Sequence, residues 1–302
     1  MRTTGELMQA AWKAKTAIPG FNIPYLPMME PVVRALRDTR CLGLIMVARL
    51  EWVKFESKSL RAIRDEYERV KDEGFTRLHL DHVPVIDEDN LRVDFERDLR
   101  EAVELGYESV MVDGSRLSFD ENIAATKAVV DMAHAKGVPV EAELGAVMGH
   151  EAGPMPPYEE LFESGKGFTD PDEARRFVVE TGVDWLSVAV GSVHGAISAA
   201  KRTEKKVEAR LSIDQLDAIR EAVNIPLVLH GGTGIRKSYV LDAIRHGIAK
   251  INVATAIRQP YEAHVEESVE KAQDAVYDTM LTVIREDLEL EGTADLLDPL
   301  GG

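Results

Sequence analysis

The feature that most constrains this chain is an alternation, repeated eight times, of a short apolar run and a longer amphipathic segment. The runs are rich in β-branched residues, and several are apolar almost throughout, such as Leu-Gly-Leu-Ile-Met-Val-Ala at 42–48. Runs of this kind are typical of parallel strands that are buried on both faces. The predicted strands are Ile18–Ile23, Leu42–Ala48, Arg77–Val83, Ser109–Gly114, Pro139–Leu144, Trp185–Val190, Pro226–Gly232 and Lys250–Thr255.

The segments between the runs have the boundaries of helices. Two of them begin with a capping-box pattern, Ser118 with Glu121 and Ser212 with Gln215. A glycine follows four predicted helix ends, at positions 106, 137, 182 and 247. The alternation therefore predicts an α/β fold, a single (β/α)8 TIM barrel domain over residues 1–302. An open, doubly wound sheet is the alternative, but its usual Gly-x-Gly-x-x-Gly motif does not follow the first strand.

Two stretches depart from this alternation. Residues 146–169 form a segment with several glycines and prolines that is longer than the usual connection, and we predict that it is a lid. Residues 260–291 are rich in helix-forming residues beyond the eighth strand. They are predicted to form a C-terminal helical extension or a subunit contact, and not a second domain.

The charge of the chain limits its partners. The formal net charge is −17 at pH 7, which argues against nucleic acid and means that an anionic substrate needs a local positive site. Residues 1–20 lack the apolar run of a signal peptide, and no apolar run is long enough to span a bilayer, so we expect neither a signal peptide nor a membrane span. Cys41 is the only cysteine, so no intramolecular disulfide can form. We therefore expect a soluble, cytoplasmic protein with neither nucleic acid nor membrane as a partner.

Polar side chains gather where the predicted strands end, and barrels carry their active sites at that face. The polar sequences at these ends are Asp81-His82, Asp113-Gly-Ser, Glu141-Ala-Glu143-Leu-Gly, Gly191-Ser-Val-His194-Gly, His230-Gly-Gly-Thr-Gly and Asn252-Val-Ala-Thr255. Three histidines thus come from three strand ends, with carboxylates between them. Three neutral imidazoles and an open position make a catalytic zinc site.

A structural role is the alternative reading for each of His82, His194 and His230 taken alone. Together, each beside Gly or Asp at a strand end, they favour a metal site. One geometric condition applies, because strict alternation along a strand places Asp81 and His82 on opposite faces. Both reach the site only if the strand ends near Asp81.

The other histidines are predicted to lie outside the metal site. His79 shares its strand face with Asp81 and is expected to pack or to support the site instead of ligating. His134, His246 and His264 lie on predicted helices among charged residues, and we expect them at the surface.

The glycines after His230 indicate a second feature of the site. They lead towards a predicted helix near residue 237, and such turns expose backbone N–H groups to an anion. With Thr255 after the eighth strand, they resemble the phosphate site that barrels often build after strands 7 and 8. A tight glycine turn without a ligand is the alternative.

In this order, these residues resemble the class II fructose-bisphosphate and tagatose-bisphosphate aldolase family. The resemblance runs from Phe21-Asn22-Ile23 to Thr255, and its motifs are specific as a set although each is weak alone. They are Asp81-His82, Asp113-Gly-Ser, Glu141-Ala-Glu-Leu-Gly, Thr169-Asp-Pro, His194-Gly195, His230-Gly-Gly and Asn252-x-x-Thr255. The resemblance implies a zinc-dependent lyase, an aldolase of carbohydrate metabolism.

For the metal, the resemblance implies one Zn²⁺ per chain with His82, His194 and His230 as its ligands. Glu143 is similar to the carboxylate that approaches the metal when the metal shifts, and Asp113 is similar to a supporting carboxylate. Another divalent metal is an alternative to zinc, and a monovalent cation is a further candidate cofactor.

For catalysis, Asp81 resembles the acid/base that serves the aldehyde oxygen, and Asn252 resembles the residue that positions the enediolate. Glu151 falls eight residues after Glu143, where the family's lid places its proton-abstracting glutamate. A solvated loop acid is the alternative for Glu151. The residues that match the family's phosphate-binding groups are Gly195, Gly231, Gly232, Thr233 and Thr255.

The chain departs from the family where the substrate would bind. After its His-Gly pair the family often has an aromatic residue and then a lysine, whereas this chain has Ala-Ile-Ser198. The second strand ends in Val-Ala-Arg49 without the usual serine, and Ala254 stands where fructose-bisphosphate enzymes often carry an aspartate. Arg49 and Ser198 are therefore candidate substrate contacts. For Arg49, a salt bridge to Glu51 or to a nearby acid is the alternative.

Three functions remain open. The first is reversible cleavage of a ketose (bis)phosphate to dihydroxyacetone phosphate and an aldehyde. The second keeps this chemistry for a carboxylated, sulfonated or singly phosphorylated ketose, with Arg49 binding the different anion. The third is an inactive, metal-binding barrel subunit, against which Asp81, Glu143 and Glu151 count because a scaffold needs no acid/base pair. We expect a small-molecule sugar substrate and a homo-oligomer, a dimer or a tetramer.

Overall fold

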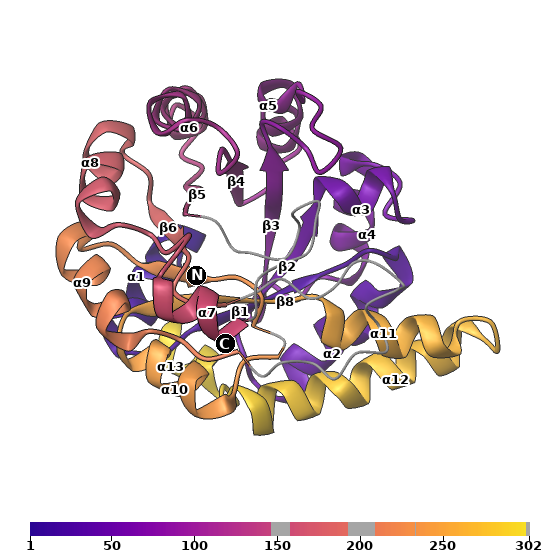
Figure 1. Ribbon diagram of the computed structural model, residues 1–302. Helices are drawn as coiled ribbons and strands as arrows, with labels where there is room; N and C mark the ends of the chain where they lie inside the picture. The colour runs from indigo at the N-terminus through magenta and orange to yellow at the C-terminus, as the bar shows by residue number, and fades with distance from the viewer. Residues whose placement is uncertain (146–157, 193–208, 233, 300–302) are drawn as a thin grey trace.

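Eight parallel strands close into a barrel in the computed structural model, which describes residues 1–145, 158–192, 209–232 and 234–299 (Figure 1). Each strand pairs with its neighbours in the sequence, and β1 completes the ring by pairing with β8. The strands are β1 Ile18–Asn22, β2 Gly43–Ala48, β3 Thr76–Pro84, β4 Ser109–Asp113, β5 Val140–Leu144, β6 Trp185–Val188, β7 Leu227–Leu229 and β8 Ile248–Val253. The predicted (β/α)8 TIM barrel is confirmed.

Helices form the outer layer around the strands (Figure 1). They are α1 Thr4–Ala14, α2 Met29–Asp38, α3 Arg49–Val53, α4 Leu60–Val70, α5 Phe95–Glu104, α6 Phe119–His134, α7 Tyr158–Ser164, α8 Pro171–Thr181, α9 Ile213–Val223, α10 Lys237–Arg245, α11 Thr255–His264, α12 Val269–Thr282 and α13 Thr293–Leu297. A 3-10 turn, η1, covers Leu26–Met28, and a π-helical turn, η3, covers Val283–Asp287. None of the described helices is long and apolar enough to cross a membrane.

The helix boundaries largely follow the predicted chemistry. At α6 the Ser118 N–H donates to the Glu121 carboxylate over 3.1 Å, so this capping box forms. At α9 only half of the box forms, because the Gln215 side-chain amide donates to the nearby Thr169 carbonyl, 2.7 Å away. The four predicted glycines after helices all have positive φ, at Gly106, Gly137, Gly182 and Gly247.

The barrel interior is apolar at the end where the strands begin. Side chains alternate along β2, so Ile45 and Val47 pack with the outer helices while Leu44 and Met46 point inward. A Cβ at Gly20 of β1 would lie 2.4 Å from the Met46 sulfur, so the Met46 side chain would have to move to admit a larger residue there. At the N-terminal ends of the strands, α1 and α13 close the interior with Leu7, Met8, Ala11, Ala294 and Leu297.

Several segments differ from the sequence prediction, and three of them lie near the site or beyond the barrel. Thr255 is the first residue of α11 and not the last of β8, because the β-branched run stops at Val253 and Ala254 turns the chain out of the strand. Helix α7 occupies part of the predicted lid, where Tyr-Glu-Glu-Leu-Phe-Glu-Ser at 158–164 favours a helix that the neighbouring prolines obscured. Beyond the barrel the helices extend from Thr255 to Leu297, and α12 packs along α2 and α11 (Figure 1).

Cys41 should be inert in the native protein. Its side chain is fully buried, and burial raises the pKa of the thiol to about 12, so the reactive thiolate is scarce near neutral pH. We expect iodoacetamide at pH 8 to leave the folded protein unmodified and to add one group after unfolding in guanidinium, as measured by intact-protein mass spectrometry. Rapid stoichiometric alkylation of the folded protein would contradict this burial.

Candidate active site

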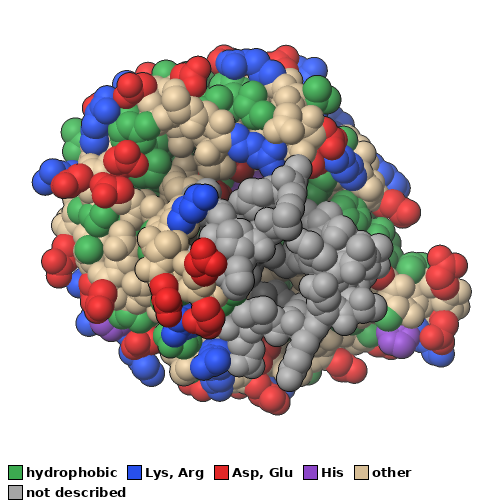
Figure 2. Space-filling model, viewed as in Figure 1, with side chains coloured by type: hydrophobic (Ala, Val, Ile, Leu, Met, Phe, Trp, Pro, Cys, Tyr) green, Lys and Arg blue, Asp and Glu red, His purple; other side chains and the backbone are tan. Residues whose placement is uncertain are grey.

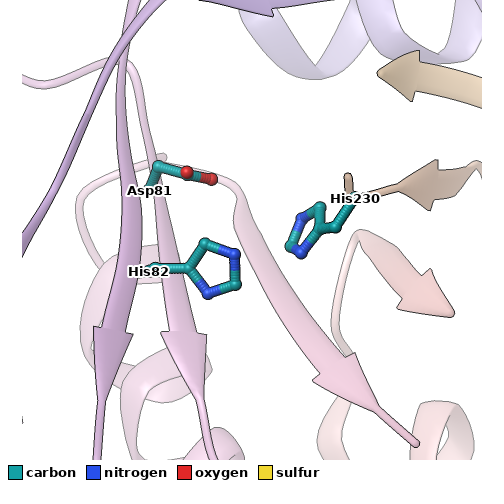
Figure 3. A group of neighbouring side chains, drawn as sticks. All are labelled: Asp81, His82 and His230. Carbon is teal, nitrogen blue, oxygen red and sulfur yellow. The ribbon is translucent and has the colours of Figure 1, made fainter. Parts of the chain in front are cut away.

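A β-bulge in β3 brings Asp81 and His82 to the same side of the strand. The pairing register between β3 and β4 shifts between Leu80 and Val83, and His82 has a positive φ of 32°. Such a bulge re-aims side chains within a continuous strand. Figure 3 shows both side chains directed towards His230, which follows β7. From the sequence, both side chains could reach the site only if the strand ended near Asp81. Instead, the strand continues to Pro84, and the bulge turns both side chains to the same side.

Asp81 is held by donors on three sides. Asn22 Nδ2 donates to Oδ2 over 3.1 Å, and Asn252 Nδ2 donates to Oδ1 over 3.0 Å. Lys250 Nζ lies 3.5 Å from Oδ1. Burial raises the pKa of Asp81, but the Lys250 ammonium and the nearby imidazoles lower it by more, so the carboxyl stays ionised. The result is an oriented carboxylate that can accept a proton.

His82 lies among carboxylates. Its Nδ1 is 3.2 Å from Asp113 Oδ2 and 3.8 Å from Glu143 Oε2. The other oxygen of Asp113 accepts from the N–H and the hydroxyl of Ser115, which fixes that carboxylate. Burial lowers the pKa of His82, but the surrounding carboxylates raise it by more, to about 10. This environment favours a positive charge at the imidazole, whether a proton or a coordinated cation supplies it.

His230 faces His82 across the site, with ring centroids 4.4 Å apart. Its Nε2 is 3.0 Å from Glu141 Oε1, while its Nδ1 is 3.1 Å from Glu143 Oε2. Neither this Nδ1 nor this Oε2 has a hydrogen-bond partner among the described residues, although both are buried. Two buried, unbonded atoms at this distance fit a site in which a cation lies against both.

The donor set therefore suits a divalent metal. Ligand atoms of Asp81, His82 and His230 lie within 4.8 Å of one another, and so do those of His82, Asp113 and Glu143. Mixed imidazole and carboxylate donors suit zinc and its neighbours among the divalent transition metals.

A buried polar layer that sequence reasoning missed lies beneath these residues. Lys250 is fully buried, and its Nζ is 2.7 Å from Glu141 Oε2 and 3.4 Å from His79 Nε2. His79 Nδ1 bonds Ser109, and burial, aided by Lys250, lowers the pKa of His79 to about 3. His79 is thus a neutral, buried side chain. The one available signal was a lysine between apolar residues in the eighth strand, since a buried ammonium is usually paired, although the sequence does not show with which acid.

Asn22 is a second residue that the sequence left without a role. It follows the apolar run of β1 and is 4% exposed. Its amide lies between Asp81 and Glu51, with Nδ2 at 3.5 Å from Glu51 Oε2. Burial raises the pKa of Glu51 to about 8. The one available signal was the position of Asn22 at a strand end.

The predicted phosphate-binding residues that are described lie at the same end of the barrel. Gly231 follows His230 with a φ of 68°, which glycine adopts readily. At Gly232 a Cβ would lie 2.7 Å from Ile251 Cγ2, so the chain passes close to β8 there. Thr255 opens α11 beside them, and α10 begins at Lys237.

Arg49 begins α3 and lies beside two acids. Its Nη1 is 3.7 Å from Asp87 and its Nε is 3.4 Å from Asp98, whereas Glu51 bonds the Ala48 N–H instead. On the face of the molecule shown in Figure 2, acidic and basic side chains are interspersed over the described residues. The guanidinium is thus already compensated by two carboxylates.

Several predicted site residues lie outside the described part of the chain. They are Glu151, His194, Gly195, Ser198 and Thr233. The three histidines expected at the surface are described: His134 is exposed on α6, His264 is partly exposed on α11, and His246 is partly exposed beside Asp217.

Comparison with known proteins gives a consistent answer. The family model "Fructose-bisphosphate aldolase class-II" matches residues 2–294. The YdjI aldolase from Escherichia coli K12 is 28% identical, with a TM-score of 0.74 over 96% of this chain and 98% of that one. A putative fructose-1,6-biphosphate aldolase from Coccidioides immitis is 25% identical, with a TM-score of 0.75 over 96% of each chain.

A more distant structure supports the fold alone. The fructose-bisphosphate aldolase of Campylobacter jejuni is 19% identical, with a TM-score of 0.71 over 95% of each chain. The family match spans every strand of the barrel and the polar strand ends that meet at its mouth. The chain therefore belongs to the class II fructose-bisphosphate aldolase family, whose members are aldehyde-lyases that act on small sugar substrates and are typically metal-dependent.

Proposed function

We propose that the protein catalyses the reversible aldol cleavage of a ketose (bis)phosphate to dihydroxyacetone phosphate and an aldehyde. The observation that carries the proposal is the convergence of an ionised carboxylate, Asp81, with the imidazoles of His82 and His230. An aldol cleavage needs a base for the hydroxyl proton and an electrophile at the ketone. Asp81 is the proposed base, and the two imidazoles are proposed to bind the divalent metal that acts as the electrophile.

We propose that His82, His194 and His230 hold Zn²⁺, with Glu143 as an alternate ligand. When bound, Zn²⁺ supplies a Lewis acid at the ketone carbonyl. The Asp113 carboxylate bonds Nδ1 of His82 and so keeps the imidazole ring in place.

Asp81 handles the proton at the aldehyde oxygen. In the cleavage direction it accepts the proton of the hydroxyl on the carbon that becomes the aldehyde, and in the condensation direction it returns that proton. Asn22 and Asn252 fix its two oxygens before substrate arrives, which lowers the cost of orienting the base. Asn252 Oδ1 is buried without a hydrogen-bond partner among the described residues, so it is placed to accept one from a substrate hydroxyl.

The substrate's phosphate would bind at the ends of β7 and β8. The donors proposed for this anion are the backbone N–H groups of the glycine turn and of the first turns of α10 and α11, which begin at Lys237 and Thr255. The residues proposed for this site are Gly195, Gly231, Gly232, Thr233 and Thr255. The ion pairs of Arg49 with Asp87 and Asp98 do not favour the alternative in which Arg49 binds a differently charged ketose.

The proposal is tested by a turnover screen. Zinc-loaded protein is incubated with fructose and tagatose bisphosphates, with singly phosphorylated ketoses, and with carboxylated and sulfonated ketoses. Release of dihydroxyacetone phosphate is followed through NADH oxidation by glycerol-phosphate dehydrogenase. Cleavage of only the singly phosphorylated, carboxylated or sulfonated ketoses, measured as free aldehyde, would support the alternative substrate. Cleavage of none of them would support the inactive subunit.

Glu151 is proposed to move the proton at the α-carbon of the ketone. Glu151→Gln should lower exchange of solvent deuterium into dihydroxyacetone phosphate by ~10²–10⁴-fold and leave zinc content unchanged, because the amide cannot act as a base. Exchange is measured by proton NMR. Glu160→Gln, an exposed glutamate on α7, is the matched control and should exchange normally. Wild-type exchange in the Glu151 variant would assign the proton transfer to another residue, with His150 or Glu143 the next to test.

A further inference from the structure

The carboxylate of Glu141, like that of Asp81, has three hydrogen-bond partners in the described part of the barrel interior. It lies on β5 and is fully buried beneath the proposed metal site. Oε2 accepts from Lys250 Nζ and from Trp185 Nε1, each over 2.7 Å. Oε1 is left for His230 Nε2 at 3.0 Å. Three donors from β6, β8 and the end of β7 therefore converge on one side chain.

These contacts decide which nitrogen of His230 carries a proton. An ionised carboxylate only accepts hydrogen bonds, so the Nε2 that faces Glu141 must be the protonated nitrogen. Glu141 is kept ionised by the ammonium of Lys250 and the indole N–H, which both bond its other oxygen. In the neutral ring the lone pair then lies on Nδ1, the atom that points to Glu143 on the metal side.

We propose that Glu141, held by Lys250 and Trp185, is the positioning residue that turns the Nδ1 lone pair of His230 towards the metal site and so sets the affinity of the protein for its divalent cation. This inference rests on the proposed function, because it takes His230 as a ligand. Asp113 stands in the same relation to His82, so each described histidine of the site is backed by its own carboxylate.

Lys250 has a second contact that links the two halves of the site. Its Nζ lies 3.5 Å from Asp81 Oδ1 as well as 2.7 Å from Glu141. One buried ammonium therefore compensates both the carboxylate that orients His230 and the carboxylate proposed to move the proton. Without it, two acids would share a region from which water is excluded.

The test compares the zinc affinity of wild-type protein and Glu141→Gln by competition with a fluorescent zinc chelator. Loss of the carboxylate should weaken zinc binding by about 10- to 100-fold, the usual effect of removing the partner of a ligating histidine. Glu108→Gln is the control, because Glu108 is likewise a hydrogen-bonded glutamate paired with a cation, Arg77, but lies at the opposite end of the barrel, where it accepts from the Leu78 N–H. It should bind zinc like the wild type.

A second pair of variants separates positioning from plain stabilisation. Glu141→Gln and Lys250→Met each leave a buried charge without its main partner, so both should lower the midpoint of thermal unfolding. The double variant removes both charges and should recover part of that midpoint. Its zinc affinity should nevertheless stay as weak as that of Glu141→Gln, because His230 still lacks its carboxylate.

The outcomes are distinguishable. Weak zinc binding in both Glu141 variants, with stability partly restored in the double variant, supports the inference. Wild-type zinc affinity in Glu141→Gln, or affinity that returns together with stability in the double variant, overturns it and leaves the proposed function intact. A wild-type protein that binds no zinc overturns the metal site of the proposed function, and the inference with it.

Discussion

Chelation of the divalent cation is expected to abolish turnover while leaving the barrel folded. The proposed ligands lie at the carboxyl ends of the strands, whereas the apolar side chains of the core lie between the barrel and its helices and at the opposite end of its interior. The fold therefore does not depend on the metal. Treatment with EDTA should remove activity, re-addition of Zn²⁺ should restore it, and the far-ultraviolet circular dichroism spectrum should stay unchanged throughout.

The same experiment gives the stoichiometry. Elemental analysis of active protein should find one divalent metal per chain, and His230→Ala should lose it. His134→Ala is the matched control, because His134 is exposed on α6 and bonds Asp184 away from the site. Active protein without stoichiometric metal would contradict the proposed chemistry, and unfolding on chelation would show that the site is structural.

Replacement of Asp81 should have the second large effect. Asp81→Ala is expected to lower kcat by ~10²–10⁴-fold, because the general base for the aldehyde oxygen is removed. Zinc content should fall far less, since His82 and His230 keep their own carboxylate partners. The measurements are steady-state cleavage rates and elemental analysis of the same samples.

Two further variants sharpen this result. Asp81→Asn preserves the shape of the side chain and should lose as much activity as Asp81→Ala, since an amide cannot accept the proton. Asp131→Ala, on the exposed face of α6, should behave like the wild type. Near-native cleavage by the Asp81 variants would show that the role assigned to this carboxylate is wrong.

The fold was predictable because its signal is local. Parallel strands buried on both faces need apolar runs, and each of the eight runs in the sequence became a strand. The boundaries were less certain, and the seventh strand, predicted at Pro226–Gly232, covers only Leu227–Leu229. Strand ends depend on pairing with neighbours, which a single sequence does not show.

The geometry of the site was less predictable, because it depends on contacts between distant segments. Alternation along β3 placed Asp81 and His82 on opposite faces, and only the irregular pairing with β4 reverses that expectation. The partnership of Glu141 with Lys250 joins residues from two strands that are not neighbours in the sheet. The sequence showed both residues, but nothing in it indicated that they meet.

The backbone of His82 has a consequence for how such a barrel can evolve. A positive φ at a non-glycine residue costs on the order of 1–3 kcal/mol, and here the surrounding strands hold the residue in that conformation. Glycine at this position would relieve the strain and remove the imidazole. Selection for thermal stability alone would thus tend to erase the side chain on which the proposed chemistry depends. Histidine at this position therefore gives up some backbone stability and keeps a reactive side chain at the mouth of the barrel.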